Sequence, residues 1–267
     1  MRLLKYLLRY RFRDMSELLR NEKAPVKDCR QSFNGKTVVI SGATSGIGLE
    51  TARRFAEYGA RLVLLNRNAG KSTALESELR ERFDADVSTI LVDFSSLDQI
   101  RRCAAELMES CRPIDVLIHN AGVFHTRRRL TDDGIETVFQ VNHLGSFFMN
   151  YLLADRLKEE NRARIIYVNS EGHRFALAGV HLKDLHWHRH IYTGLKSYGA
   201  AKTAQILTMY RFREIFGSGG VTVNAMHPGN VESHIGENNG RLYRWTKKHF
   251  VLASAKQPDI SAKALHY

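Results

Sequence analysis

The sequence predicts an α/β fold, a doubly wound parallel sheet with helices on both faces. First, short β-branched runs typical of buried strands alternate along the chain with longer stretches of helical periodicity. Second, the run Thr37–Ile40 leads into a glycine-rich turn, Ser41–Gly48, and then into a helical pattern that stops at Gly59. A strand, a tight turn and a helix form the first half of a βαβ unit, and repetition of that unit builds a parallel sheet.

The same alternation continues over the rest of the chain. Further strands are predicted at Arg61–Leu65, Ser88–Val92, Ile114–Ile118, Arg164–Val168 and Val221–Ala225. Helices are predicted at residues 49–59, 70–83, 97–111, 131–153 and 206–216, and residues 264–267 have the pattern of another. Because open parallel sheets bind ligands at the carboxyl ends of their strands, we expect the functional site there.

Three glycines in the first turn, Gly42, Gly46 and Gly48, have the spacing G-x3-G-x-G. Glycine lets backbone N–H groups approach a ligand closely, and the N-terminus of the following helix supplies partial positive charge for a phosphate. The spacing differs from the G-x-G-x-x-G of the common dinucleotide fingerprint. A glycine-rich turn alone is a weak signal, because many such turns are only turns.

Further motifs follow in order, and together with the glycine turn they resemble the short-chain dehydrogenase/reductase family. They are Asn120-Ala121-Gly122, Asn142, Ser170, the pair Tyr198-x3-Lys202, and Pro228-Gly229. The resemblance rests on their common order and covers about residues 35–267, for which it implies a single Rossmann-fold domain. The segment from Asp184 to Tyr192 is similar to the loop of the retinol-dehydrogenase-like branch, whereas Asn169 stands where the family usually has a small residue.

The resemblance implies a nicotinamide dinucleotide bound at the strand ends. The cofactor-binding residues that it implies are Gly42, Thr44, Ser45, Gly46, Ile47, Gly48, Arg67, Asp93, Asn120, Tyr198, Lys202, Pro228 and Gly229. After the second strand of such a fold, an acid hydrogen-bonds the ribose 2′-hydroxyl of NAD, whereas an arginine accommodates the 2′-phosphate of NADP. Asn66 is neutral and Arg67 is cationic there, which favours NADP(H). The alternative is an arginine that is only solvated.

The pair Tyr198 and Lys202 is the strongest indication of catalysis. Residues four apart share one face of a helix, so the ammonium and the phenol can lie side by side. Free tyrosine titrates near about 10, and a neighbouring cation lowers that pKa, as a general acid or base near neutrality requires. The resemblance adds Ser170, which hydrogen-bonds the carbonyl oxygen, and Asn142, which a helix bend and a bound water link to Lys202.

We therefore expect an oxidoreductase that transfers a hydride between NADP(H) and an alcohol/carbonyl pair. The resemblance to retinol dehydrogenases and an apolar lid expected over residues 230–250 suggest a lipophilic substrate, such as a retinoid, a steroid or a fatty aldehyde. A non-catalytic NADP-binding scaffold is the alternative, because family members normally continue beyond residue 267 into one more strand. A sugar-nucleotide epimerase fits poorly, since its loop is usually G-x-x-G-x-x-G.

The composition is that of a globular protein with one large core: 267 residues, 43% hydrophobic and 25% charged. The formal charge of +12 favours an acidic binding partner, such as nucleic acid, anionic lipid or a phosphate-rich cofactor. No nucleic-acid-binding motif accompanies this charge, so we expect no nucleic-acid partner. Four histidines between residues 181 and 190 are interpreted as surface residues, and no metal is expected. The three cysteines lack zinc-like or C-x-x-C spacing and suit a reducing compartment.

Residues 1–34 are predicted to form an arm, a basic amphipathic helix over residues 1–20 and a linker, in front of the domain at residues 35–267. Such a helix can lie in a membrane interface, direct the chain to mitochondria, or pack on its own domain or a second subunit, and these alternatives remain open. The sequence contains no apolar run of about 18 residues, so no segment is predicted to span a membrane. We expect an intracellular protein, cytoplasmic or peripheral on a membrane, with mitochondria as the alternative and a homodimer as a candidate assembly.

Overall fold

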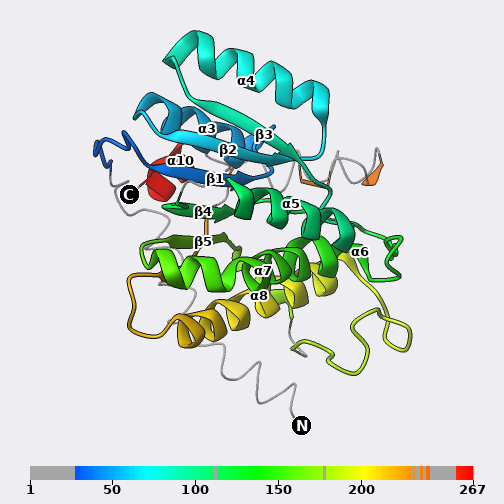
Figure 1. Ribbon diagram of the computed structural model, residues 1–267. Helices are drawn as coiled ribbons and strands as arrows, with labels where there is room; N and C mark the ends of the chain where they lie inside the picture. Colours follow the sequence, from blue (N-terminus) through cyan, green and yellow to red (C-terminus); the bar gives the residue numbers. More distant parts are fainter. Residues whose placement is uncertain are drawn as a thin grey trace.

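A single sheet of six parallel strands, in the order β3-β2-β1-β4-β5-β6, lies at the centre of the computed structural model (Figure 1). The structure describes residues 28–110, 113–176, 179–229, 231, 235–236, 239–240 and 257–266, and these statements concern them alone. The strands are β1 Thr37–Ser41, β2 Arg61–Asn66, β3 Val87–Leu91, β4 Val116–His119, β5 Arg164–Val168 and β6 Thr222–Met226. The predicted doubly wound fold is confirmed.

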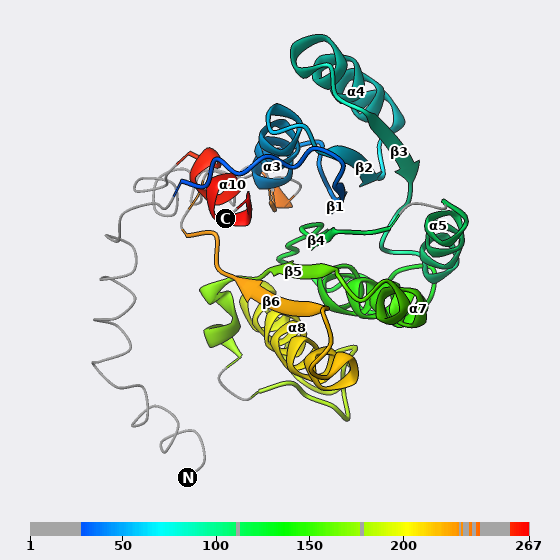
Figure 2. The same ribbon diagram turned by 60° about the vertical axis from the view of Figure 1, so that its left-hand side comes forward.

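Helices cover both faces of this sheet. They are α3 Gly46–Glu57, α4 Ala69–Phe83, α5 Leu97–Glu109, α6 Thr137–Phe139, the π turn η1 Gln140–Leu144, α7 Gly145–Glu160, the 3₁₀ turn η2 Glu171–Phe175, α8 Gly194–Phe216 and α10 Asp259–His266. Figures 1 and 2 show α3, α4 and α10 on one face and α5, α7 and α8 on the other.

The core has two halves because successive side chains of a strand point to opposite faces of the sheet. All five residues of β1 are buried. Val39 belongs to the apolar cluster that contains Leu153 of α7, whereas Val38 and Ile40 belong to the cluster that contains Phe55 of α3. A parallel sheet covered on both faces requires such continuous apolar runs, and this is why the strands could be recognised from sequence.

The strand order reverses between β1 and β4. From β1 the chain moves outward to β2 and β3, then returns to β4 and moves outward again through β5 to β6. Ligands of open α/β sheets bind at the carboxyl ends of the strands where the order reverses. The topology thus brings the glycine turn, which follows β1, beside the Asn-Ala-Gly motif, which follows β4.

The prediction of a helix over residues 131–153 is wrong about where the helix starts. A bridge between Leu130 and Glu136 closes a turn there, and the helical stretch begins only at Thr137. The buried carboxylate of Glu136 caps that stretch by accepting two backbone N–H groups of the first turn, at 3.1 and 2.8 Å. The stretch then passes through η1 into α7 and continues to Glu160.

The two ends of the described chain meet on α3. The ring of His266, at the end of α10, lies among Phe33, Phe55 and Tyr58, with ring centroids 4.9, 5.3 and 4.4 Å away. His266 Nδ1 also lies 2.9 Å from the carbonyl oxygen of Cys29. The part of the expected linker that follows residue 28 therefore packs on α3.

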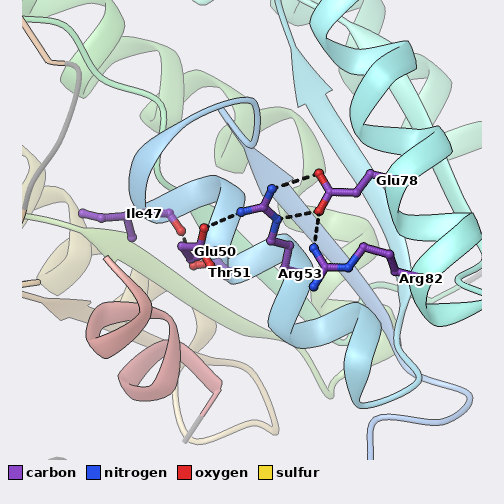
Figure 3. A network of polar contacts seen from close by, with 6 residues as sticks. All are labelled: Ile47, Glu50, Thr51, Arg53, Glu78 and Arg82. Atoms are coloured by element: carbon purple, nitrogen blue, oxygen red, sulfur yellow. Dashed lines mark hydrogen bonds and ion pairs between the residues drawn. The ribbon is translucent and has the colours of Figure 1, made fainter. Parts of the chain in front are cut away.

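Ion pairs join α3 to α4 on the surface (Figure 3). The Arg53 guanidinium donates to both carboxylate oxygens of Glu78, at 2.7 and 2.9 Å, and to Glu50 at 2.6 Å. Arg82 donates to the same Glu78 carboxylate at 2.8 Å. The hydrogen bonds from Arg53 hold the pKa of Glu78 below its usual value. The network fixes the outer side of α3, whose N-terminus follows the glycine turn.

Several sequence predictions lie outside the described residues. They are the amphipathic helix over residues 1–20, the linker up to residue 27, and most of the expected lid over residues 230–250. In the described part of the chain, no helix is both long and apolar enough to cross a membrane.

Candidate active site

The glycine turn after β1 is shaped by its three glycines. Gly42 and Gly46 have positive φ angles, 70° and 54°, a conformation that favours glycine. At Gly48 a Cβ atom would lie 2.3 Å from the carbonyl oxygen of Gly42 and 2.5 Å from Asn120 Nδ2. At Gly42 a Cβ atom would lie 3.0 Å from the Cα atom of Ala121. The turn therefore packs directly against the Asn-Ala-Gly motif.

Hydrogen bonds join the ends of β1 and β4 at this place. Asn120 Nδ2 donates to the carbonyl oxygens of Ser41, at 3.1 Å, and Gly42, at 2.9 Å. Ser41 Oγ accepts the backbone N–H groups of Asn120 and Ala121, both at 3.0 Å. Asn120 thus joins the end of β4 to the end of β1 at the centre of the sheet. Ser41 was missed, because a serine at the end of a strand carries no distinguishing sequence signal.

The turn and the start of α3 fit a phosphate-bearing dinucleotide. Ser45 is the N-cap of α3, but its side chain makes no cap hydrogen bond, and the first turn contains no acidic residue. The first N–H groups of the helix therefore point toward the turn without a capping side chain or a competing carboxylate. Thr44 and Ile47 are partly exposed there. The missing side chains at the glycines leave the backbone accessible at the same place.

The end of β2 holds the glycine turn on one side and presents a cation on the other. Asn66 is buried, and its Oδ1 accepts the backbone N–H of Ala43 at 2.8 Å, so it supports the turn. Arg67 is exposed, with Nη1 3.4 Å from Asp93 Oδ2 at the end of β3. The Asp93 carboxylate also accepts the backbone N–H and hydroxyl of Ser95, at 2.8 and 2.7 Å. Arg67 is therefore weakly held beside the place predicted for the adenosine ribose.

Ser170 and Tyr198 come together around Gly172. A Cβ atom at Gly172 would lie 3.1 Å from Ser170 Oγ and 2.7 Å from Tyr198 Cε1, so both groups lie close to one point. Ser170 Oγ accepts the backbone N–H of Gly172 at 3.0 Å and caps η2. Since the hydroxyl is the acceptor in that bond, its own proton can be donated to a substrate oxygen.

Lys202 lies beside Tyr198 on α8, one turn further along. Its Nζ is 5.8 Å from the centroid of the tyrosine ring and donates to the carbonyl oxygen of Val168 at 2.8 Å. The lysine is 4% exposed, and this burial lowers the pKa of its ammonium to about 7. Phe124 also contacts the tyrosine ring edge to face, with centroids 5.8 Å apart.

Asn142 lies in the π turn η1, and the backbone of Val123 holds its side chain. Its Oδ1 accepts the backbone N–H of Val123 at 2.7 Å, and its Nδ2 donates to the carbonyl oxygen of Val123 at 2.9 Å. The backbone carbonyl of Asn142 instead accepts Gln205 Nε2 at 3.0 Å. A π turn displaces one carbonyl from the regular helical ladder, and here that displaced region faces α8.

The segment after β6 approaches the same site. Gly229 has a φ of 83°, and the carbonyl oxygen of Pro228 accepts the hydroxyl of Ser261 at 2.8 Å, which attaches this segment to α10. Within the expected lid, Asn239 donates to the carbonyl oxygen of Phe124 and accepts the backbone N–H of Thr126, both at 2.8 Å. One residue of the expected lid thus lies beside Phe124, in the loop that follows β4.

Two buried carboxylates near the site organise loops. Glu136 accepts the hydroxyl of Ser197 at 2.9 Å and that of Tyr192 at 3.2 Å, and so fixes the residue before Tyr198. Asp184 accepts the backbone N–H groups of residues 188, 189 and 190, at 2.7, 3.0 and 3.0 Å.

In the part of the chain described here, no three histidine, cysteine or acidic side chains are grouped so that they could hold a metal.

The comparisons with known proteins agree with this geometry. Residues 36–181 match the model of the family described as "short chain dehydrogenase". The chain is 38% identical to human retinol dehydrogenase 13 over 214 residues, 79% of this chain and 63% of that protein. It is 39% identical to the human WW domain-containing oxidoreductase over 207 residues, 75% of this chain and 50% of that protein.

Two solved structures show the same fold. A protein from Mycobacterium paratuberculosis, 28% identical, has a TM-score of 0.68 over 88% of this chain and 77% of its own. A short-chain dehydrogenase from Sphingobium yanoikuyae in complex with NADPH, 24% identical, has a TM-score of 0.69 over 86% of this chain and 82% of its own. The chain spans between half and two thirds of the length of the first curated relatives it matches. It belongs to the short-chain dehydrogenase family of oxidoreductases, in its retinol-dehydrogenase-like branch.

Proposed function

We propose that the protein transfers a hydride between NADP(H) and an alcohol/carbonyl pair on a lipophilic substrate. The observation that supports this most is the meeting of Ser170 and Tyr198 around Gly172, with the buried Lys202 on the same face of α8. A site that only bound the cofactor would not require these three side chains together. The reaction therefore explains their arrangement better than a non-catalytic scaffold does.

Each residue has a role that follows from its surroundings. When bound, the cofactor supplies the hydride. In the reductive direction Ser170 donates a hydrogen bond to the carbonyl oxygen, and Tyr198 gives its phenolic proton to the oxygen as negative charge develops there. The Lys202 ammonium stabilises the phenolate that remains. In alcohol oxidation the same proton moves from the alcohol to the phenolate.

The residues that would hold the cofactor are the cofactor-binding residues that the family resemblance implied. The glycine turn and the first N–H groups of α3 would hold the pyrophosphate, Pro228 and Gly229 would lie by the nicotinamide, and Lys202 would also bind its ribose. Arg67 selects NADP(H), because it is exposed, cationic and free to exchange its 3.4 Å contact with Asp93 for a 2′-phosphate. Asn66, engaged with the backbone of Ala43, offers no carboxylate to the 2′-hydroxyl of NAD.

Two observations support the proposal of a lipophilic substrate. Relatives at 38% identity are named retinol dehydrogenase 13 and retinol dehydrogenase 12. Apolar ring surface also faces the reacting tyrosine, since Phe124 packs on Tyr198. We further propose that residues 1–34 act as an arm to the domain at residues 35–267 and touch a membrane surface through residues 1–20. A homodimer, and a cytoplasmic or mitochondrial location, remain predictions.

A cofactor titration followed by a substrate screen tests the proposal. Nicotinamide fluorescence should report tighter binding of NADPH than of NADH. Turnover should then be found with retinal, a steroid ketone or a long-chain aldehyde, and should be lost in Tyr198→Phe, which keeps the ring but not the proton. Turnover with small polar carbonyls alone would refute the lipophilic substrate. NADPH binding without turnover of any carbonyl would favour the scaffold.

A further inference from the structure

The side-chain amide of Gln205 lies between two residues of the proposed catalytic set. Gln205 is on α8, three residues after Lys202, and is 1% exposed. Its Oε1 is 3.3 Å from Lys202 Nζ, and its Nε2 donates to the backbone carbonyl of Asn142 at 3.0 Å. One amide therefore connects the ammonium to the π turn directly.

A second amide completes this cluster. Asn169 Nδ2 donates to Gln205 Oε1 at 2.9 Å and to the carbonyl oxygen of Lys202 at 3.0 Å. Asn169 Oδ1 accepts the backbone N–H of Ser170 at 2.8 Å. The departure noted at position 169 thus has a partner at position 205. Through these two amides Ser170, Lys202 and the backbone of Asn142 belong to one hydrogen-bonded unit.

The surroundings allow Gln205 only one orientation. Two donors, Lys202 Nζ and Asn169 Nδ2, face one end of the amide, and an acceptor, the carbonyl of Asn142, faces the other. Rotating the amide by half a turn would place its NH₂ group against an ammonium and another NH₂ group. The oxygen is consequently directed at Lys202 in the arrangement that satisfies every group.

A neutral acceptor suits the charge that it faces. A buried ammonium has three N–H donors and needs acceptors in place of water, and the carbonyl of Val168 takes one of them at 2.8 Å. A carboxylate at position 205 would cancel the field of the ammonium at Tyr198 by forming an ion pair. An amide oxygen stabilises the ammonium and leaves its net charge to act on the phenol.

We propose that Gln205 is a positioning residue that holds the Lys202 ammonium and the π turn at Asn142 in their working arrangement. The inference rests on the proposed function, because Lys202 acts through Tyr198 in that reaction. Gln205 touches neither substrate nor cofactor in this account. It joins the lysine to the backbone of Asn142, where the family resemblance implied that a bound water makes the link.

The test compares Gln205→Leu with Thr208→Val. Thr208 is buried on the same helix, and valine keeps its shape, so this variant controls for altered packing. In protein carrying ¹³C-labelled lysine, NMR titration of the Lys202 side chain should give a pKa about one unit lower in Gln205→Leu than in the wild type and Thr208→Val. In alcohol oxidation, kcat at pH 7 should fall about tenfold, with its rising limb moved about one unit to higher pH, while the KM of the alcohol changes less than about twofold.

The outcomes separate this inference from the proposed reaction. An unchanged Lys202 pKa and an unchanged pH profile, with only a lower melting temperature, would overturn the positioning role and leave Gln205 as a structural residue. The NMR titration does not depend on turnover, so a wild type without activity would refute the reaction and still decide the role of Gln205. Should Gln205→Leu fail to fold, Gln205→Met keeps the length of the side chain without the amide and is measured in the same way.

Discussion

Replacing Gly48 by alanine tests how the glycine turn is built. A Cβ atom there would lie 2.3 Å from the carbonyl oxygen of Gly42 and 2.5 Å from Asn120 Nδ2, the two partners of a 2.9 Å hydrogen bond. Both atoms would have to retreat by about 1 Å to reach ordinary van der Waals contact. Neither is the free end of a flexible chain, since one belongs to the backbone and the other is fixed by two hydrogen bonds.

The cost follows from these contacts. Overpacking of a rigid site costs about 1–3 kcal/mol, and the loss of the Asn120 bond adds about 1 kcal/mol. Gly48→Ala should therefore lower the free energy of unfolding by about 2–4 kcal/mol and abolish tight NADPH binding, because the shifted carbonyl lies in the turn proposed to hold the phosphates. Urea denaturation measures the first effect, and nicotinamide fluorescence the second.

A second glycine provides the matched control. At Gly70, in the first turn of α4, the nearest atom to an added Cβ is Asn68 Oδ1 at 3.7 Å, which is ordinary contact. Gly70→Ala should leave NADPH binding unchanged and raise the free energy of unfolding by up to about 1 kcal/mol, since alanine favours helix. If Gly48→Ala also kept the stability and NADPH affinity of the wild type, the tight packing between the turn and Asn120 would be refuted.

Three other perturbations follow from the structure. Arg67→Ala should weaken NADPH binding about tenfold and leave NADH binding unchanged, because it removes the charge-assisted contact proposed for the 2′-phosphate; equal losses for both cofactors in a titration would contradict that role. Complete burial lowers the pKa of His119 to about 4, so the unfolded state binds the proton more readily, and stability is full above about pH 6.5 and declines as the pH falls toward 4. Between pH 7 and pH 5 the free energy of unfolding should drop by about 2 kcal/mol more in the wild type than in His119→Gln, and parallel urea curves for the two would refute this. Arg53→Ala should cost about 1 kcal/mol at low salt and less at 1 M salt, since its pairs with Glu78 and Glu50 are partly exposed; a cost independent of salt would point to packing of the arginine stem instead.

The strands were predictable because each is a short run rich in β-branched or aliphatic residues; β1 and β4 are buried throughout, whereas the edge strands β3 and β6 bury only some of their residues. The prediction at Thr37–Ile40 differs from β1 by one residue, and Arg164–Val168 coincides with β5. The start of the helix at Thr137 was not predictable, because it depends on the buried Glu136, whose partners on Ser197 and Tyr192 come from a distant part of the chain. Hydrophobic periodicity contains no information about such a cap.

In the site, too, single residues could be identified from sequence motifs, whereas their contacts with residues distant in sequence could not. Resemblance selected Asn142, but periodicity could not show that its backbone carbonyl, rather than its side chain, faces α8. Likewise Asn169 was noticed only as a departure, because its partner Gln205 is distant in sequence and unremarkable within a helix. Pairs of polar residues that satisfy each other inside a core are visible only once the strands and helices are assembled.

The meeting of both ends of the described chain on α3 has a consequence for synthesis on the ribosome. Phe55 and its neighbour Phe33 are synthesised early. Its other neighbour, His266, lies at the far end of the described chain and is synthesised much later. Leu265 belongs to the same apolar cluster. During translation this side of α3 stays uncovered until α10 has left the exit tunnel, so the nascent chain exposes an apolar surface to chaperones while the residues between α3 and α10 are synthesised.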